Sequence, residues 1–102
     1  VASASTITPN AETTTQFNIT ALNQSTTIQK PSGSVSDGKK LTIRIRDNGT
    51  DRALTWITSV GGYRAVGAVL PTTTKAGKVT YVGCVYNAQD DFWDVLAVTT
   101  QA

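Results

Sequence analysis

Lys40-Leu41-Thr42-Ile43-Arg44-Ile45-Arg46 is the stretch that decides the fold class, because apolar and polar residues alternate strictly along it. A period of two places the three aliphatic side chains on one face of a β-strand and Thr42, Arg44 and Arg46 on the other face. The stretch therefore predicts a strand with one face against a core and the other facing outward.

A turn and a second alternating stretch follow it. Asp47-Asn48-Gly49-Thr50 contains Asn and Gly, which tolerate the positive φ that tight turns require. Arg52-Ala53-Leu54-Thr55-Trp56-Ile57 then alternates again and places Leu54 and Trp56 on one face. We therefore predict a β-hairpin over residues 40–57.

Shorter strands are expected along the rest of the chain, separated by turn-forming clusters. They cover residues 6–8, 16–20, 26–29, 63–70 (bent or broken at Gly67), 78–86 and 92–98. The segment from Lys78 to Tyr86 is apolar on both faces, with Val79, Tyr81 and Val85 pointing one way and Val82, Cys84 and Tyr86 the other. This pattern indicates a central strand or one that faces a partner subunit.

Composition favours the same class. The 102 residues include 18 Thr and 10 Val, which are β-branched, whereas strong helix formers are scarce. We expect one all-β domain over residues 1–102, an antiparallel sandwich or barrel of seven to nine short strands with no long helix. Residues 1–5 and 99–102 are expected to be flexible or connecting segments.

The residue composition excludes several classes of functional site. There is no histidine and a single cysteine, so a Ser-His-Asp triad, a Cys-His pair, an internal disulfide and a His- or thiolate-based metal site are all excluded. The net charge of +2 is far from the balance of a nucleic-acid-binding domain, and no apolar run approaches membrane-spanning length. We expect no enzymatic activity, no cofactor, no metal, no nucleic-acid partner and no membrane insertion.

Two local features have a structural and a functional interpretation. Cys84 lies mid-strand without a neighbouring base, which favours a buried small hydrophobe over a catalytic thiol. Asp90, Asp91 and Asp94 form an acidic cluster that suits either a turn or a calcium loop. The EF-hand pattern is absent, and Asp94 is expected to point away from Asp90, so the turn is favoured.

The basic and aromatic residues supply the candidate contact sites. Arg44 and Arg46 would meet Arg52 across the predicted hairpin and form a basic patch for phosphate or an acidic sugar, although ion pairs with Asp47 and Asp51 explain them more simply. The aromatic residues suit either a core or a sugar-stacking platform. Tyr63 and Arg64, beside Gly61-Gly62, are the best candidate for contact with a glycan. The aromatic set is Trp56, Tyr63, Tyr81, Tyr86, Phe92 and Trp93.

The order of several motifs resembles a known β-rich module. These motifs are Asp37-Gly38 with Leu41, Arg44-Ile45-Arg46-Asp47, Arg52-Ala53-Leu54-Thr55-Trp56, Tyr63-Arg64, Leu70-Pro71, Tyr81-Val82-Gly83, Tyr86-Asn87-Ala88 and Trp93-Asp94-Val95. Together, over residues 6–100, they resemble a module widespread in tailed-bacteriophage virion proteins, found in tail-fibre-like and head-decoration-like proteins. The resemblance implies a jelly-roll-like domain on the virion surface, often a trimer, and implies no catalytic residue.

The expected function follows from that resemblance. The chain is interpreted as a bacteriophage virion structural protein, a capsid decoration or head-fibre protein or a tail-fibre module, that assembles as a homotrimer and docks on the major capsid protein or on tail proteins. The alternative is a carbohydrate-binding β-sandwich that recognises a host surface glycan, and the two are compatible.

Overall fold

A computed structural model describes residues 3–13 and 15–101, and it is all-β. The described residues form eight strands and no helix. The strands are β1 Thr6–Ile7, β2 Gln16–Leu22, β3 Thr26–Ile28, β4 Lys40–Asp47, β5 Leu54–Trp56, β6 Tyr63–Ala65, β7 Val79–Asn87 and β8 Phe92–Thr100. Each lies within or beside a segment where the alternation predicts a strand, so the all-β class and the strand positions are confirmed.

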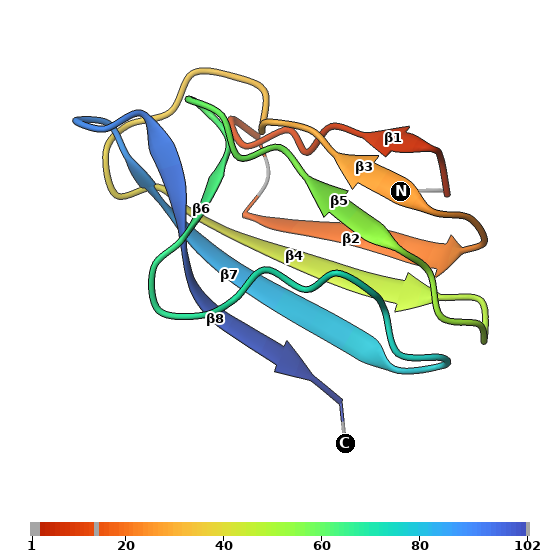
Figure 1. Cartoon of the computed structure of the whole chain (residues 1–102). Helices are drawn as coiled ribbons and strands as arrows, with labels where there is room; N and C mark the ends of the chain where they lie inside the picture. The colour runs from red at the N-terminus through yellow and green to blue at the C-terminus, as the bar shows by residue number, and fades with distance from the viewer. Residues whose placement is uncertain (1–2, 14, 102) are drawn as a thin grey trace.

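The strands form two sheets that face each other (Figure 1). One sheet has three strands in the order β1-β3-β5, and the other has five in the order β2-β4-β7-β8-β6. From β1 to β6 the chain changes sheet after every strand. β3, β4 and β5 therefore each lie beside the strand two before them, as in a β-solenoid. The hairpin of β7 and β8 lies between β4 and β6, so β6 pairs with β8 at the far edge of the larger sheet.

The predicted hairpin over residues 40–57 is wrong. β4 pairs with β7 in antiparallel and with β2 in parallel orientation, whereas β5 pairs with β3 in the opposite sheet. The turn after Asp47 carries the chain across to the other sheet instead of back along β4. Alternation correctly gives the buried faces of both strands, but two strands that face each other across a core have the same pattern as two strands of a hairpin.

The expected antiparallel architecture is also wrong for most strand pairs. β1 with β3, β3 with β5, β2 with β4, and β6 with β8 are parallel, and only the pairs that include β7 are antiparallel. The cause is the alternation between sheets, since a strand that crosses the core and returns runs in its original direction.

The core lies between the sheets. Its aliphatic part is Ile7, Ile19, Leu22, Ile28, Leu41, Ile43, Ile45, Leu54, Val82 and Val95. Two aromatic rings link the layers, since Trp56 of β5 meets Tyr63 of β6 edge to face with centroids 4.9 Å apart. The inward faces predicted for β4 and β5 are therefore those that the structure buries, and of the two apolar faces of β7 it is the one with Val82 and Cys84 that enters the core.

The segment expected as a strand over residues 63–70 is cut short. Only Tyr63–Ala65 pairs with β8, and the chain leaves the sheet after two further hydrogen bonds, from the N–H groups of Val66 and Gly67 to the carbonyl of Val95. Before β6, Gly62 packs so tightly that a Cβ there would lie 2.2 Å from the carbonyl oxygen of Ile57.

The expected connecting segments are tied to the domain where they are described. β8 runs to Thr100, and the N–H of Gln101 still donates to the carbonyl of Val79. At the other end, Ser3 Oγ lies 2.9 Å from Asn23 Oδ1, and Ser5 accepts a bond from the N–H of Thr27. Residues 1, 2 and 102 lie outside the described residues.

Candidate functional site

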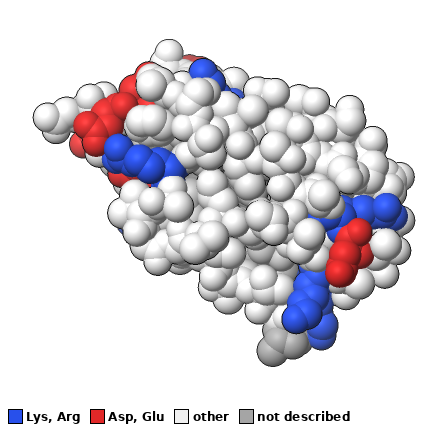
Figure 2. All heavy atoms as spheres, in the orientation of Figure 1, with Lys and Arg blue, Asp and Glu red and all other residues white. Residues whose placement is uncertain are grey.

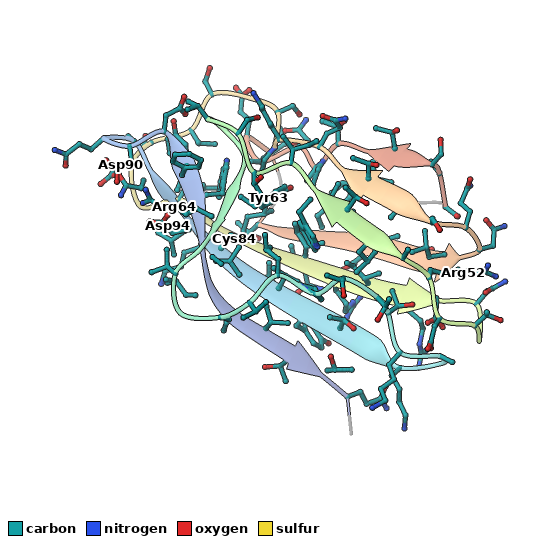
Figure 3. All side chains as sticks on the ribbon, viewed as in Figure 1. Arg52, Tyr63, Arg64, Cys84, Asp90 and Asp94 are labelled. Atoms are coloured by element: carbon teal, nitrogen blue, oxygen red, sulfur yellow. The ribbon has the colours of Figure 1, made fainter. Side chains whose placement is uncertain are left out.

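Arg64 lies at one end of the molecule, where two carboxylates hold it (Figure 3). Its Nε lies 2.7 Å from Asp94 Oδ1, and its Nη2 lies 3.1 Å from Asp90 Oδ2. The guanidinium also stacks 4.9 Å from the ring centre of Phe92. Hydrogen bonding to Asp94, more than to Asp90, raises the pKa of Arg64.

The expectation that Asp94 points away from Asp90 is wrong, whereas the turn expected at the acidic cluster is present. Asp94 and Asp90 converge on one guanidinium instead of pointing apart, because β6 places Arg64 directly beside Asp94 in the register of the sheet. Asp90 and Asp91 lie in the turn between β7 and β8, as the turn interpretation predicts. Two carboxylates satisfy Arg64, so it is poorly placed to attract a further anion.

Tyr63 does not present its ring to the surface. The residue is fully buried, and its O–H donates to the carbonyl of Gln29 at 2.9 Å. Burial raises the pKa of the Tyr63 phenol. The expected glycan contact at Tyr63 is therefore wrong, because the Gly61-Gly62 segment leads into a strand that turns this side chain into the core.

The other rare side chains are also in the core. Trp93 is 2% exposed, and Trp56 is 8% exposed and donates from Nε1 to the carbonyl of Pro71. Cys84 is buried, and burial raises the pKa of its thiol to about 12. The core interpretation of these three residues is confirmed, and a reactive thiolate at Cys84 has no physical basis.

A hollow of about 460 Å³ lies beside the Arg64 cluster. Its polar lining includes Lys30, Tyr86 and Asp91. The Tyr86 O–H donates to Asp91 Oδ1 at 2.8 Å, and this bond is the main cause that raises the pKa of Tyr86. The hydroxyl and the carboxylate thus satisfy each other, and the lining holds no second carboxylate with which Asp91 would form a catalytic pair.

The outward face of the larger sheet carries a different set of groups. In the register of the sheet, Asn18 of β2 lies beside Arg44, Arg44 lies beside Tyr81 of β7, and Tyr81 lies beside Thr99 of β8. Arg46 stands two residues along β4 on the same face, opposite Val79. Tyr81 is 40% exposed although large and apolar.

These groups surround a shallow depression of about 290 Å³, which we call the Arg44 hollow. It is lined by Ile19, Thr20, Arg44, Arg46, Val79 and Tyr81. The lining contains two guanidinium groups and no carboxylate. Arg44 is half-buried, and neither arginine forms a hydrogen bond or ion pair with any residue in the part of the chain that the structure describes.

The expected ion pairs of Arg44 and Arg46 with Asp47 and Asp51 do not form. Asp47 is buried and accepts from Thr74 Oγ1 at 2.6 Å, from the N–H of Gly77 at 2.7 Å and from the N–H of Gly49 at 3.0 Å. Asp51 accepts from the N–H of Ala76 at 2.6 Å. Both carboxylates are engaged in joining two loops, and this leaves the arginines of β4 on the open face.

Tyr81 is the neighbour that sequence reasoning did not connect to Arg44. Alternation along residues 78–86 places its ring outward, but the pairing of Arg44 with Tyr81 depends on the register between β4 and β7, which are far apart in sequence. Such a register follows from packing of the two strands and has no local sequence signal.

The described residues 3–13 and 15–101 contain no group of three or more His, Cys, Asp or Glu side chains placed to hold a metal ion. Over the same ranges, no helix is long and apolar enough to cross a membrane.

Comparisons with known proteins identify no relative of this chain. No family model matches the chain, and neither the curated proteins nor the solved structures contain a match to it.

Proposed function

We propose that this chain is a structural module of a tailed-bacteriophage virion surface, which works by assembly into a trimer and docking on other virion proteins, with no catalytic role. The ordered motifs from Asp37-Gly38 to Trp93-Asp94-Val95 support the virion assignment by resemblance. We also propose that the domain is related to the jelly-roll-like domains of virion shells. Its two packed sheets of short strands support this relationship in a general way.

The observation that carries the assembly proposal is an open sheet edge on β8. β6 pairs only with Trp93, Asp94 and Val95, so the second half of β8 has no strand on the side away from β7 among the described residues (Figure 1). The N–H of Gln101 points to β7. Because backbone groups alternate along a strand, those of Val98 and Thr100 point to the open edge.

This edge lacks charge and proline, two of the usual protections against pairing, although β8 has a bulge where its register with β7 shifts and Gly67 packs close to the carbonyl of Leu96. Natural edge strands carry charges, prolines or covering segments. The open half of β8 reads Leu96-Ala97-Val98-Thr99-Thr100, without a charge or a proline, and Leu96 is 50% exposed. Figure 2 shows charged residues at the upper left, along the top and at the lower right of the visible face, with an uncharged surface between them.

A second open edge makes a ring possible. The terminal strands of the larger sheet are β6, which covers only the first half of β8, and β2, whose residues Gln16–Leu22 carry no charge either. Pairing of β8 in one copy with β2 in the next is a head-to-tail contact, and such contacts close into rings when the rotation allows. We propose that the ring contains three copies.

Sedimentation velocity at micromolar concentration tests the assembly. The wild-type chain is expected near three times its mass of 10.8 kDa. Thr100→Pro removes an N–H that faces the open edge and breaks no bond to β7, so this variant is expected to be monomeric, whereas Thr100→Ala stays trimeric. A wild-type monomer, or a Thr100→Pro trimer, contradicts the proposed edge.

The virion assignment has a separate test. The genes that flank the parent reading frame are expected to encode capsid or tail proteins, with a short frame beside the major capsid gene for a decoration protein and a long frame beside tail genes for a fibre. A frame within a set of metabolic genes contradicts the assignment and leaves the assembly test unaffected.

A further inference from the structure

We infer that the Arg44 hollow is a binding site for an acidic saccharide, one that carries a carboxylate or sulfate group. This inference goes beyond the proposed assembly, because it concerns the outward sheet face and not the strand edge. The hollow is lined from β2, β4 and β7, so its geometry is set by the sheet and not by a mobile loop.

The two arginines account for the acidic group. Arg44 and Arg46 project from the same face of β4, with Cα atoms about 7 Å apart for two residues of extended strand. Guanidinium groups bind carboxylates and sulfates through paired, charge-assisted hydrogen bonds. Asp47, the nearest carboxylate in sequence, points into the core and accepts from Thr74, so it does not compete for this position, and the lining of the hollow contains no carboxylate.

The surroundings of the arginines favour a sugar over other acidic partners. Tyr81 offers an exposed ring directly beside Arg44, and sugar rings stack on aromatic faces. A hydroxyl side chain continues the row beyond Tyr81, where Thr99 lies in the register of the sheet. A hydroxyl group can both donate to and accept from sugar hydroxyls.

Nucleic acid fits the same surface less well. Phosphate backbones are bound by extended basic stripes that neutralise many phosphates. The net charge of this chain is +2, and the arginines of the hollow are only two. A depression of about 290 Å³ has the size for one or two sugar rings and not for a duplex.

Other charged regions are weaker candidates because their groups are already satisfied. Arg64 is held by Asp90 and Asp94, and the Tyr86 hydroxyl is bonded to Asp91. The guanidinium groups of Arg44 and Arg46 differ from these in having no polar partner within the described residues.

Isothermal titration with defined probes tests the inference. The probes are an oligogalacturonate, a sulfated oligosaccharide, a neutral maltooligosaccharide, inorganic sulfate and a short DNA duplex. The test variant is Arg44→Gln with Arg46→Gln, and the control is Lys39→Gln with Lys75→Gln, which removes the same charge elsewhere. Thermal unfolding and sedimentation of each variant show whether fold and assembly are retained.

The inference predicts binding of at least one acidic oligosaccharide and none of the neutral one. Loss of two charge-assisted contacts is expected to weaken binding by about tenfold to a hundredfold in the arginine variant and less than about twofold in the lysine control. Tyr81→Ala is expected to weaken binding, whereas Tyr81→Phe keeps it. The inference is overturned by equal loss in both double variants, by equal affinity for inorganic sulfate alone, by tighter binding of DNA, or by no acidic saccharide bound.

Discussion

Replacement of Asp47 by alanine is expected to cost this domain a large part of its stability. The carboxylate sits at the end of β4 and is 4% exposed. It accepts three hydrogen bonds, from Thr74 Oγ1 and from the N–H groups of Gly77 and Gly49. The residue therefore joins the turn after β4 to the loop before β7, where the chain passes between the two sheets.

The size of the effect follows from what happens to the three donors. Thr74 is buried, so its hydroxyl loses an acceptor that water does not readily replace, at a cost of about 1–3 kcal/mol. Gly49 and Gly77 are exposed, so their N–H groups can form hydrogen bonds with water instead, and the loss of each bond to Asp47 costs about 1 kcal/mol of stability. Asp47→Ala is expected to lower the free energy of unfolding by about 3–5 kcal/mol, out of the 5–15 kcal/mol typical of a domain.

Urea unfolding followed by the fluorescence of Trp56 and Trp93 measures this loss, since both rings are buried. Asp51→Ala is the matched control. Asp51 accepts one bond from the N–H of Ala76, but it is exposed, and its loss is expected to cost less than about 1 kcal/mol. If Asp47→Ala falls within 1 kcal/mol of Asp51→Ala at unchanged m-value, the buried carboxylate does not hold the two loops together.

Three further outcomes follow from individual residues. Burial by itself would raise the pKa of Asp47, but the hydrogen bonds from Thr74, Gly77 and Gly49 bring it below the ordinary 3.8. The carboxylate therefore contributes its full stabilisation above the unfolded-state pKa, and this is lost as the pH falls through the folded-state pKa. In a pH series of urea unfolding, the stability of Asp47→Asn should fall less steeply on the acid side than that of the wild type. Gly62→Ala brings a Cβ against the carbonyl of Ile57 and should lower stability by about 2–3 kcal/mol in the same assay, whereas Gly38→Ala, with open space around it and a φ of +84°, should lose only about 1 kcal/mol. The Cys84 thiol, with its pKa raised to about 12 by burial, should resist a thiol reagent at pH 8 in the folded protein and react after unfolding; rapid labelling of the folded chain would show that the core opens at β7.

Much of the fold was predictable from the alternation of residue types. The residues of β4 and β5 that alternation places inward, such as Leu41 and Leu54, are buried. Alternation reports the face of a strand and not its neighbour, and this is why the position of β5 was predictable while its sheet was not. A turn of Asn48 and Gly49 suits a hairpin, but the buried bonds of Asp47 direct the chain across the core.

The orientation of some candidate contact residues could be predicted from the sequence and that of others could not, for a similar physical reason. Arg44 and Arg46 lie on the outward face, where the alternation of β4 places them. Tyr63 begins a predicted strand directly after two glycines, but its pattern does not say which face it takes, and in the structure it points inward and donates from its O–H to the carbonyl of Gln29. The pairing of Arg44 with Tyr81 required the register between distant strands, which long-range packing determines.

Hydrogen exchange at the open edge of β8 tests the central claim, assembly through sheet edges, most directly. The amides of Val98 and Thr100 point away from β7, whereas the amide of Gln101 donates to Val79. Exchange is started in D₂O at protein concentrations from nanomolar to high micromolar, is quenched at set times, and is read by NMR after the samples have been concentrated. We predict that Val98 and Thr100 become protected as concentration rises, while Gln101 changes little. Fast exchange of Val98 and Thr100 at every concentration would contradict the account.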